Sequence, residues 1–188
     1  MADEPAVDEA AAGEPEEASA PEVDAQELRH GVPVSSSHGM QVLHPERDQL
    51  CSVVRTLRDD DGFNMCLDVC AVDYLTYDAE RVLPAGVAPE RYEIVVTLMS
   101  HAARERLRLR VQVPADDPTC PSLFEVHPGT EAMEREAFDL FGIAFTDHPD
   151  LTRILMPEDW DGYPLRKDEA QGRIPVQFKA AADDRSGR

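Results

Sequence analysis

Residues 92–113 read YEIVVTLMSHAARERLRLRVQV and show the clearest strand pattern in the chain. Both halves alternate apolar and polar side chains, the apolar ones being Tyr92, Ile94, Val96, Leu98, Leu107, Leu109, Val111 and Val113. A period of two indicates a strand that buries one of its faces. Because only a short connector, residues 100–104, separates the halves, they are predicted to form an antiparallel hairpin.

Neighbouring segments add one more strand and two helices. Alternation over residues 63–71 predicts a strand with one apolar face, made of Phe63, Met65, Leu67, Val69 and Ala71. Residues 45–58 carry apolar side chains at helical spacing, namely Leu50, Val53, Val54 and Leu57. Residues 131–141 are predicted to be a helix with Thr130 as N-cap, Gly142 as stop and a buried stripe of Met133, Ala137, Leu140 and Phe141. On this helix, Arg135 lies four residues from both Glu131 and Asp139, a spacing that suits ion pairs.

These elements predict an α+β fold, a small antiparallel sheet with helices packed on it. Residues 30–145 form the predicted core domain. Residues 1–29 are assigned to a disordered acidic N-terminal tail, and residues 146–188 to an extended C-terminal arm that docks on a partner.

The overall charge excludes two classes of function. The chain has 188 residues, with 38 Asp and Glu against 18 Lys and Arg, for a formal charge of −20. Binding to nucleic acid or to an anionic membrane needs a basic surface, which this composition argues against. Apolar runs such as residues 94–96 are short, whereas a membrane-spanning helix needs about 20 apolar residues.

The acidic tail has its own composition. Residues 1–27 contain ten acids and no Lys or Arg. With no aromatic residue, this stretch cannot bury enough apolar surface to become ordered alone. It also lacks the features of a secretory signal or a mitochondrial presequence. We favour a solubilising role for it over the alternative, an interaction arm.

The C-terminal arm shows neither helical nor strand periodicity. Prolines at 149, 157, 164 and 175 interrupt it, yet large apolar residues recur along it, among them Ile154, Leu155, Trp160 and Leu165. Such spaced anchors suit a segment that wraps a partner surface. The alternative is that the arm wraps its own domain.

Chemistry-bearing patterns are sparse. Cysteines at 51, 66, 70 and 120 contain no CxxC pair, so we expect reduced thiols and no metal or iron–sulfur cluster. Glu134 and Glu136 lie on roughly opposite sides of their predicted helix and cannot act on one bond. The basic stripe Arg106, Arg108 and Arg110 has no interleaved aromatics, and we interpret it as a solvated or acid-paired strand face and not as a nucleic-acid groove.

A resemblance covers the second half of the chain. The runs EREAFDLFGI (134–143), HPDL (148–151), RIL (153–155) and DWDGYPLRKD (159–168) resemble the respiratory complex I 30-kDa subunit family, the C subunit of NADH-quinone oxidoreductase. Weaker matches are LDVCAVDY (67–74) and RYEIV (91–95). The chain departs from the pattern at Tyr163, where many relatives have His.

The resemblance implies a non-catalytic subunit of the peripheral arm, on the cytoplasmic side of the bacterial inner membrane. It would support the quinone-reducing module and bind no cofactor itself, because FMN and iron–sulfur clusters belong to partner subunits, and NADH and quinone are substrates of the complex. The implied partners are the 49-kDa-type (D) subunit and neighbouring cluster-bearing subunits. The motif residues expected to dock on them are Glu134, Arg135, Glu136, Asp139, His148, Pro149, Arg153, Trp160, Tyr163, Pro164, Leu165, Arg166, Lys167 and Asp168.

One alternative from the same reasoning is an equivalent scaffold in a membrane-bound hydrogenase, or in a quinone-linked dehydrogenase with another electron donor. A stand-alone hydrolase ranks behind both, because the chain shows no nucleophile motif. Since the chain ends at Arg188, we expect a separate subunit and not a fusion with the D-type subunit.

Overall fold

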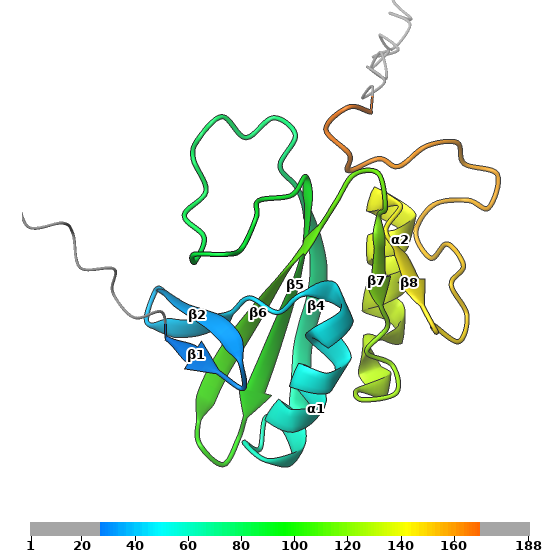
Figure 1. The fold of residues 1–188 in the computed structure, drawn as a ribbon. Helices are drawn as coiled ribbons and strands as arrows, with labels where there is room; N and C mark the ends of the chain where they lie inside the picture. The colour runs from blue at the N-terminus through cyan, green and yellow to red at the C-terminus, as the bar shows by residue number, and fades with distance from the viewer. Residues whose placement is uncertain (1–26, 170–188) are drawn as a thin grey trace, which may run out of the picture.

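The computed structural model describes residues 27–169 and shows an α+β fold, as predicted (Figure 1). Six strands form one sheet in the order β1-β2-β3-β6-β5-β4. Its centre is the predicted hairpin, in which β5 (Tyr92–Ser100) pairs antiparallel with β6 (Glu105–Val113). Strand β4 (Met65–Asp73) pairs antiparallel with the other edge of β5. Most of the predicted acidic tail, and residues 170–188 of the predicted arm, lie outside the described residues.

Three strands that the sequence patterns missed extend the sheet beyond β6. They are β1 (Leu28–Arg29), β2 (Val32–Ser37) and β3 (Met40–Leu43), joined by tight turns at His30-Gly31 and His38-Gly39, where all four φ angles are positive. Their short length and several serines hide the alternation that marked the longer strands.

The sheet is mixed and not purely antiparallel, because β3 runs parallel to β6. The chain leaves β3 through a 3-10 turn, η1 (Arg47–Gln49), and the helix α1 (Leu50–Asp59), and then enters β4. A helical crossover of this kind brings the chain back to the same end of the sheet, so β3 and β4 point the same way. Since β4 and β6 both pair antiparallel with β5, β3 must be parallel to β6.

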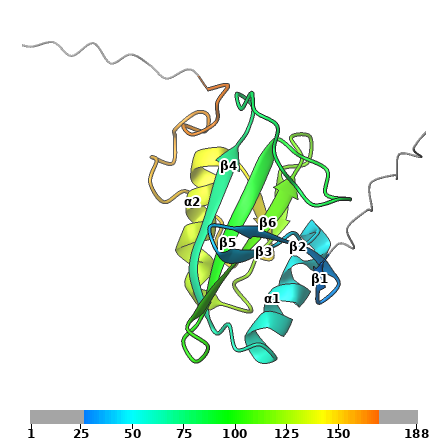
Figure 2. The same cartoon turned by 90° about the vertical axis from the view of Figure 1, so that its left-hand side faces the viewer.

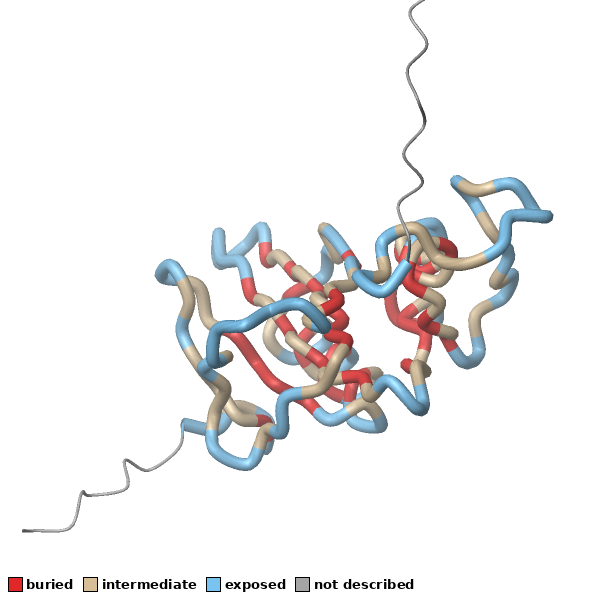
Figure 3. Tube along the Cα trace, turned by 90° about the horizontal axis from the view of Figure 1, so that it is seen from above, coloured by how far each residue is buried: buried red, intermediate tan, exposed pale blue. Residues whose placement is uncertain are grey.

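Both helices lie on one side of the sheet, and Figure 2 looks onto the other side. The stripe predicted for α1 (Leu50, Val53, Val54, Leu57) is buried as expected. The helix α2 (Glu131–Phe141), preceded by η2 (Pro128–Thr130), buries Ala137 and Phe141 and packs Met133 and Leu140 against the same core. Buried residues gather in these elements, and the connecting loops are mostly exposed (Figure 3).

Two predicted details differ from the structure. Helix α1 begins at Leu50, because Glu46 is extended and forms a capping box with Gln49 before the 3-10 turn. In β4 a bulge at Leu67 shifts the register between Cys66 and Asp68. Such a bulge reverses the alternation, so Met65 is 40% exposed and Cys66 packs toward the core.

A small pair of strands lies beside α2 and completes the core. Strands β7 (Thr119–Pro121) and β8 (Ala144–Thr146) pair parallel and bury Cys120 and Phe145. Helix α2 ends at Gly142, which has a φ of +73°, as the sequence predicted. A Cβ at this position would lie 2.6 Å from the Tyr163 ring, so the close approach of residues 163–166 also requires glycine.

We predict that Phe141→Ala lowers the free energy of unfolding by about 3–5 kcal/mol, because it opens a cavity under α2. The Phe141 side chain belongs to the single core cluster that the sheet and both helices share within the described residues. Urea denaturation of the full chain measures the loss. Glu136→Ala, at an exposed position of the same helix, is the control and should change stability by no more than about 0.5 kcal/mol. Equal losses in the two variants would contradict this packing.

Candidate interaction surface

The buried carboxylate of Asp139 holds the segment that follows β8. Residues 147–169 contain no helix or strand, yet the Asp139 Oδ2 atom accepts hydrogen bonds from the backbone N–H groups of Ile154, Leu155 and Met156 at 3.1, 2.7 and 2.8 Å. Its Oδ1 atom accepts one from the Arg153 guanidinium at 2.7 Å. The Asp139 side chain itself is fully buried.

These bonds determine the protonation of Asp139. Burial alone would raise the pKa of this carboxyl, because an apolar surrounding disfavours the charged form. The backbone N–H groups of residues 154–156 and the Arg153 guanidinium outweigh burial and lower the pKa from 3.8 to about 2. Asp139 is therefore a carboxylate at neutral pH.

Arg135 fixes the same segment from the next turn of α2. Its guanidinium donates to the carbonyl of Thr152 at 3.0 Å, to the Thr152 hydroxyl at 2.9 Å and to the carbonyl of Arg153 at 3.0 Å. The spacing of α2 had predicted ion pairs of Arg135 with Glu131 and Asp139. The structure has other contacts in place of these two ion pairs. Arg135 bonds oxygen atoms of Thr152 and Arg153, and Asp139 pairs with the guanidinium of Arg153.

Arg153 continues the anchoring toward residue 163. Besides its pair with Asp139, its guanidinium donates to the carbonyls of Trp160 and Gly162 at 3.2 and 3.1 Å. It also lies 5.4 Å from the centre of the Tyr163 ring. One arginine thus joins α2 to the turn before Pro164.

The end of the described segment is tied to α2 and to the sheet. The Leu165 N–H donates to the carbonyl of Leu140 at 3.1 Å, and the Arg166 guanidinium donates to the carbonyl of Phe141 at 2.6 Å. The Lys167 N–H donates to the Asp73 carboxylate at 2.8 Å. Arg91 bridges the carboxylates of Asp73, at 3.0 Å, and Asp168, at 2.7 Å.

Large apolar side chains of this anchored segment face solvent. The exposed fractions are 42% for Ile154, 61% for Leu155, 47% for Trp160 and 42% for Leu165. The backbone is thus held by polar bonds to its own domain while the apolar groups stay uncovered. We call these four side chains the arm surface.

The other motif residues are distributed as follows. Glu134 is fully buried, where it accepts hydrogen bonds from the Ser122 hydroxyl at 2.6 Å and the Leu123 N–H at 2.8 Å. Glu136 is exposed, so the two glutamates do not converge. The His148 ring lies 3.1 Å from the carbonyl of Glu131 and accepts from the Asp150 N–H, which stabilises the turn beyond β8. Pro149 is exposed and Pro164 is half-buried.

Three anchoring residues were not identified from the sequence. Asp73 and Arg91 are 18 residues apart and meet Asp168 only through the fold. Glu93 is buried on the sheet face opposite the helices and pairs with Arg110 at 2.7 Å, which confirms the acid-paired interpretation for one of the three stripe arginines. The short runs LDVCAVDY and RYEIV contain these residues, but nothing local in either run indicates the pairing.

The described residues hold neither a metal-binding cluster nor a membrane-spanning helix. No group of three or more His, Cys, Asp or Glu side chains is placed to hold a metal ion within residues 27–169. In the same range, no helix has the length and apolar character needed to cross a membrane. Burial raises the pKa of the Cys66 and Cys70 thiols to about 11, so both are protonated at neutral pH.

We predict that Asp139→Asn releases residues 153–156 from α2 at neutral pH. Removing one partner of a buried ion pair costs about 3–5 kcal/mol. The neutral Asn side chain is also a weaker acceptor than the carboxylate for the N–H groups of residues 154–156. Hydrogen exchange of the Ile154, Leu155 and Met156 amides should accelerate, while the amides of β5 and β6 remain protected. Glu136→Gln, on the exposed side of α2, is the matched control. Unchanged exchange at residues 154–156 would contradict the anchoring role.

The anchoring should also depend on pH. A carboxyl whose pKa is lowered by folding stabilises the structure above its ordinary value, and that contribution is lost as the pH falls. For Asp139 the loss should run from about pH 4 to about pH 2, between its ordinary pKa of 3.8 and its folded value of about 2. The difference in urea stability between the original chain and Asp139→Asn should shrink over this range. A difference that is constant from about pH 6 to about pH 2 would exclude the assigned role.

The sequence matches a described family over most of the core and the arm. Residues 43–173 match the family described as respiratory-chain NADH dehydrogenase, 30 Kd subunit. The NADH-quinone oxidoreductase C subunit of Saccharopolyspora erythraea is 43% identical over 159 residues, which cover 80% of this chain and 60% of that protein. The same subunit of Streptomyces coelicolor is 45% identical over 145 residues, which cover 76% of this chain and 54% of that protein. The chain thus spans between a half and two thirds of the length of these two relatives.

Solved structures share the fold. A structure described as the trypsin-resistant fragment (1-134) of Nqo5 is similar with a TM-score of 0.56 and 32% identity, covering 64% of this chain and 90% of that one. A chain of the membrane-bound sulfane sulfur reductase, an archaeal respiratory membrane complex, has a TM-score of 0.62 at 18% identity, covering 81% of this chain and 89% of that one. The second likeness, at such low identity, concerns the fold alone. From the match over residues 43–173 and the identity to these relatives, the chain belongs to the respiratory-chain NADH dehydrogenase 30-kDa subunit family.

Proposed function

We propose that the chain is a structural subunit of the peripheral arm of a proton-pumping NADH–quinone oxidoreductase, on the cytoplasmic side of the membrane. Its role there is to support the quinone-reducing module. FMN and the iron–sulfur clusters belong to the partner subunits, and NADH and quinone are substrates of the whole complex. The observation that carries this proposal is the arm surface, a set of exposed apolar side chains on a backbone that hydrogen bonds anchor to α2.

The energetics of the arm surface favour docking. Several large apolar side chains exposed along one short segment favour an interaction site, and Trp is a residue that often dominates interface energy. Because residues 153–156 are already anchored to α2, binding does not have to order them. A preorganised surface loses less conformational entropy on association and so binds more tightly for the same contacts.

The contacts of residues 147–169 with their own domain change the docking mechanism that the sequence led us to expect. The sequence favoured an arm that wraps a partner, but the described part, residues 147–169, lies against its own α2 and β4. The charged cluster at 166–168 is also largely used internally, since Arg166 bonds the carbonyl of Phe141 and Asp168 pairs with Arg91. Lys167 is exposed and remains available to a carboxylate of the partner. The residues beyond 169 lie outside the described part of the chain.

The partner we propose is the 49-kDa-type (D) subunit, together with neighbouring cluster-bearing subunits. The arm surface requires a partner with an apolar concavity able to accept Trp160 and Leu155. A flanking carboxylate would complement Lys167.

We predict that Trp160→Ala lowers incorporation of the tagged full chain into the complex at least about tenfold, equivalent to about 1.4 kcal/mol of binding free energy. The measurement is a pull-down from detergent-solubilised membranes, with quantification of the D-type subunit by mass spectrometry and assay of membrane NADH–quinone activity. Val82→Ala is the control, because Val82 is 91% exposed on the 74–91 loop and is not part of the arm surface. Normal incorporation of Trp160→Ala would remove the arm surface from the proposal.

The same pull-down tests the alternative of a related scaffold. Recovery of flavin- and NADH-binding subunits with the chain supports the NADH–quinone oxidoreductase. Recovery of hydrogenase subunits or of another electron-input module in their place would favour the alternative.

A further inference from the structure

Within residues 27–169, the side chains of three arginines on one strand and its turn make no hydrogen bond or ion pair. This range contains thirteen arginines, and ten of them make a hydrogen bond, an ion pair or both. The three without such a contact among the described residues are Arg104, Arg106 and Arg108, in the β5–β6 turn and on β6. The Nε atom of Arg108 is even buried without an acceptor in this part of the chain. In a chain of net charge −20, such cations concentrated on a single element need an explanation.

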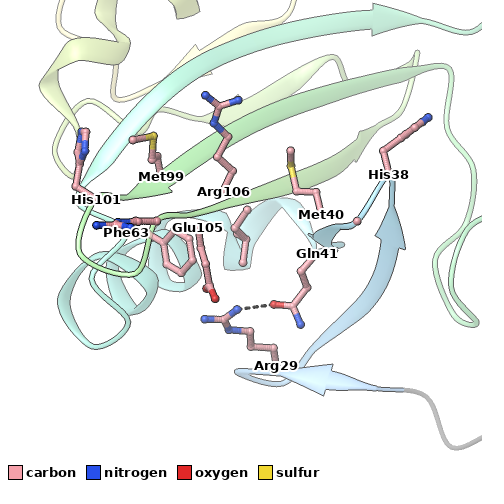
Figure 4. Close-up of a pocket in the computed structure, with 12 residues that line it drawn as sticks. Arg29, His38, Met40, Gln41, Phe63, Met99, His101, Glu105 and Arg106 are labelled. Atoms are coloured by element: carbon pink, nitrogen blue, oxygen red, sulfur yellow. Dashed lines mark hydrogen bonds between the residues drawn. The ribbon is translucent and has the colours of Figure 1, made fainter.

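Two methionines flank one of these arginines, Arg106, on the sheet face opposite the helices. Met65 of β4 is in register with Met99 of β5, and Met99 is in register with Arg106 of β6. Because the next residues along, Gln41 and Leu107, are in register, Met40 of β3 lies beside Arg106. Figure 4 shows Met99, Arg106 and Met40 on one side of the sheet, with Phe63 and Arg29 on the other. We call Met40, Met65, Met99, Arg104, Arg106 and Arg108 the Arg–Met face.

The Arg–Met face borders an open hollow at the end of the sheet. The hollow has a volume of about 880 Å³, and its lining includes Arg104, Arg106, Met40 and Met99. Arg29 and Gln41 line its other side. Arg and Met are both enriched in interfaces, and the flexible thioether of Met adapts to differently shaped partners. The composition of this face is therefore that of a binding surface for something acidic.

The acidic segment of the same chain joins the fold at this hollow. Residues 1–27 carry ten acids and no base. The last of these acids, Glu27, accepts a backbone hydrogen bond from Val34 at 3.0 Å and a side-chain bond from Gln41 at 3.5 Å, so it sits beside a residue that lines the hollow. The acidic segment therefore joins the described fold beside the hollow that the Arg–Met face borders.

We propose that residues 1–27 bind the Arg–Met face of their own chain and cover it. A coil of 26 residues has a root-mean-square span of about 25–30 Å, long enough to cross from β1 to β6. Tethering at the rim gives an effective concentration in the millimolar range. Guanidinium groups pair with carboxylates through two bonds, and the methionines accept the Ala, Val and Pro side chains of the segment.

The cover is expected to be weak and reversible. Exposed ion pairs contribute little individually and are screened by salt. Several acids share three arginines, so many pairings of similar energy are available. Shielding of the face therefore does not depend on one particular pairing.

The test is zero-length carbodiimide cross-linking of the free full chain. Arg106→Lys keeps the charge and supplies an amine that couples to a carboxylate in contact with it. Arg55→Lys is the matched control, since Arg55 is a half-exposed arginine on α1, on the helix side of the sheet. Trypsin releases the acidic segment as one peptide, residues 1–29, because Arg29 is its first basic residue. Mass spectrometry then measures its coupling to each introduced amine.

We expect coupling of the 1–29 peptide to be at least about tenfold higher in Arg106→Lys than in Arg55→Lys, and to disappear in about 0.5 M salt as the Debye length shrinks to a few ångströms. A mixture of ¹⁵N-labelled and unlabelled chains should give links within single chains. Equal coupling in the two variants, or links only between different chains, would overturn the proposal.

Nuclear magnetic resonance of the full chain gives a second readout. Replacing the acids at 3–24 with their amides should shift the amide signals of residues 104–108 and leave those of α1 unchanged. Identical signals for residues 104–108 before and after the replacement would also overturn the proposal.

Discussion

The buried carboxylate of Asp139 is the interaction on which the placement of residues 147–169 depends. It accepts hydrogen bonds from three consecutive N–H groups and from the Arg153 guanidinium, which also donates to the backbone carbonyl of Asp139. Irregular backbone cannot satisfy its own N–H groups, so a buried acceptor that takes three of them replaces secondary structure. These bonds outweigh the cost of burying the charge and so lower the pKa of Asp139 to about 2.

Within residues 27–169, buried carboxylates anchor irregular chain at three further places. Asp73 accepts the N–H groups of Leu75 and Lys167 and pairs with Arg91. Glu93, which is 1% exposed, forms ion pairs with Arg110 and Arg81. It thereby holds the 74–91 loop to the sheet face opposite the helices. Glu134 holds residues 122–123 beneath α2. The strong negative charge of the chain therefore has a structural part, buried and paired, and a separate part concentrated in residues 1–27.

Sequence patterns located the elements in which apolar side chains recur regularly over many residues. They missed the features that depend on contacts between residues far apart in the sequence. The β5–β6 hairpin and the buried stripes of α1 and α2 follow from side chains a few positions apart. The parallel β3–β6 pair was missed because β3 has only four residues, and the bulge at Leu67 because nothing local marks it. At the site, Asp139 and Arg153 were named from a family resemblance, but their pairing across 14 residues was not. Helical spacing pointed instead to Arg135.

The two exposed surfaces differ in the kind of partner that they suit. The arm surface is apolar, so its affinity comes from removing Leu155 and Trp160 from water, and salt should affect it little. The Arg–Met face is charged, so its affinity is electrostatic and falls as salt rises. They lie on different parts of the fold, the 147–169 segment and the β3–β6–β5–β4 sheet face, and share no residue. One surface can therefore be occupied while the other is free, and binding at the Arg–Met face does not require a change in the anchoring by Asp139.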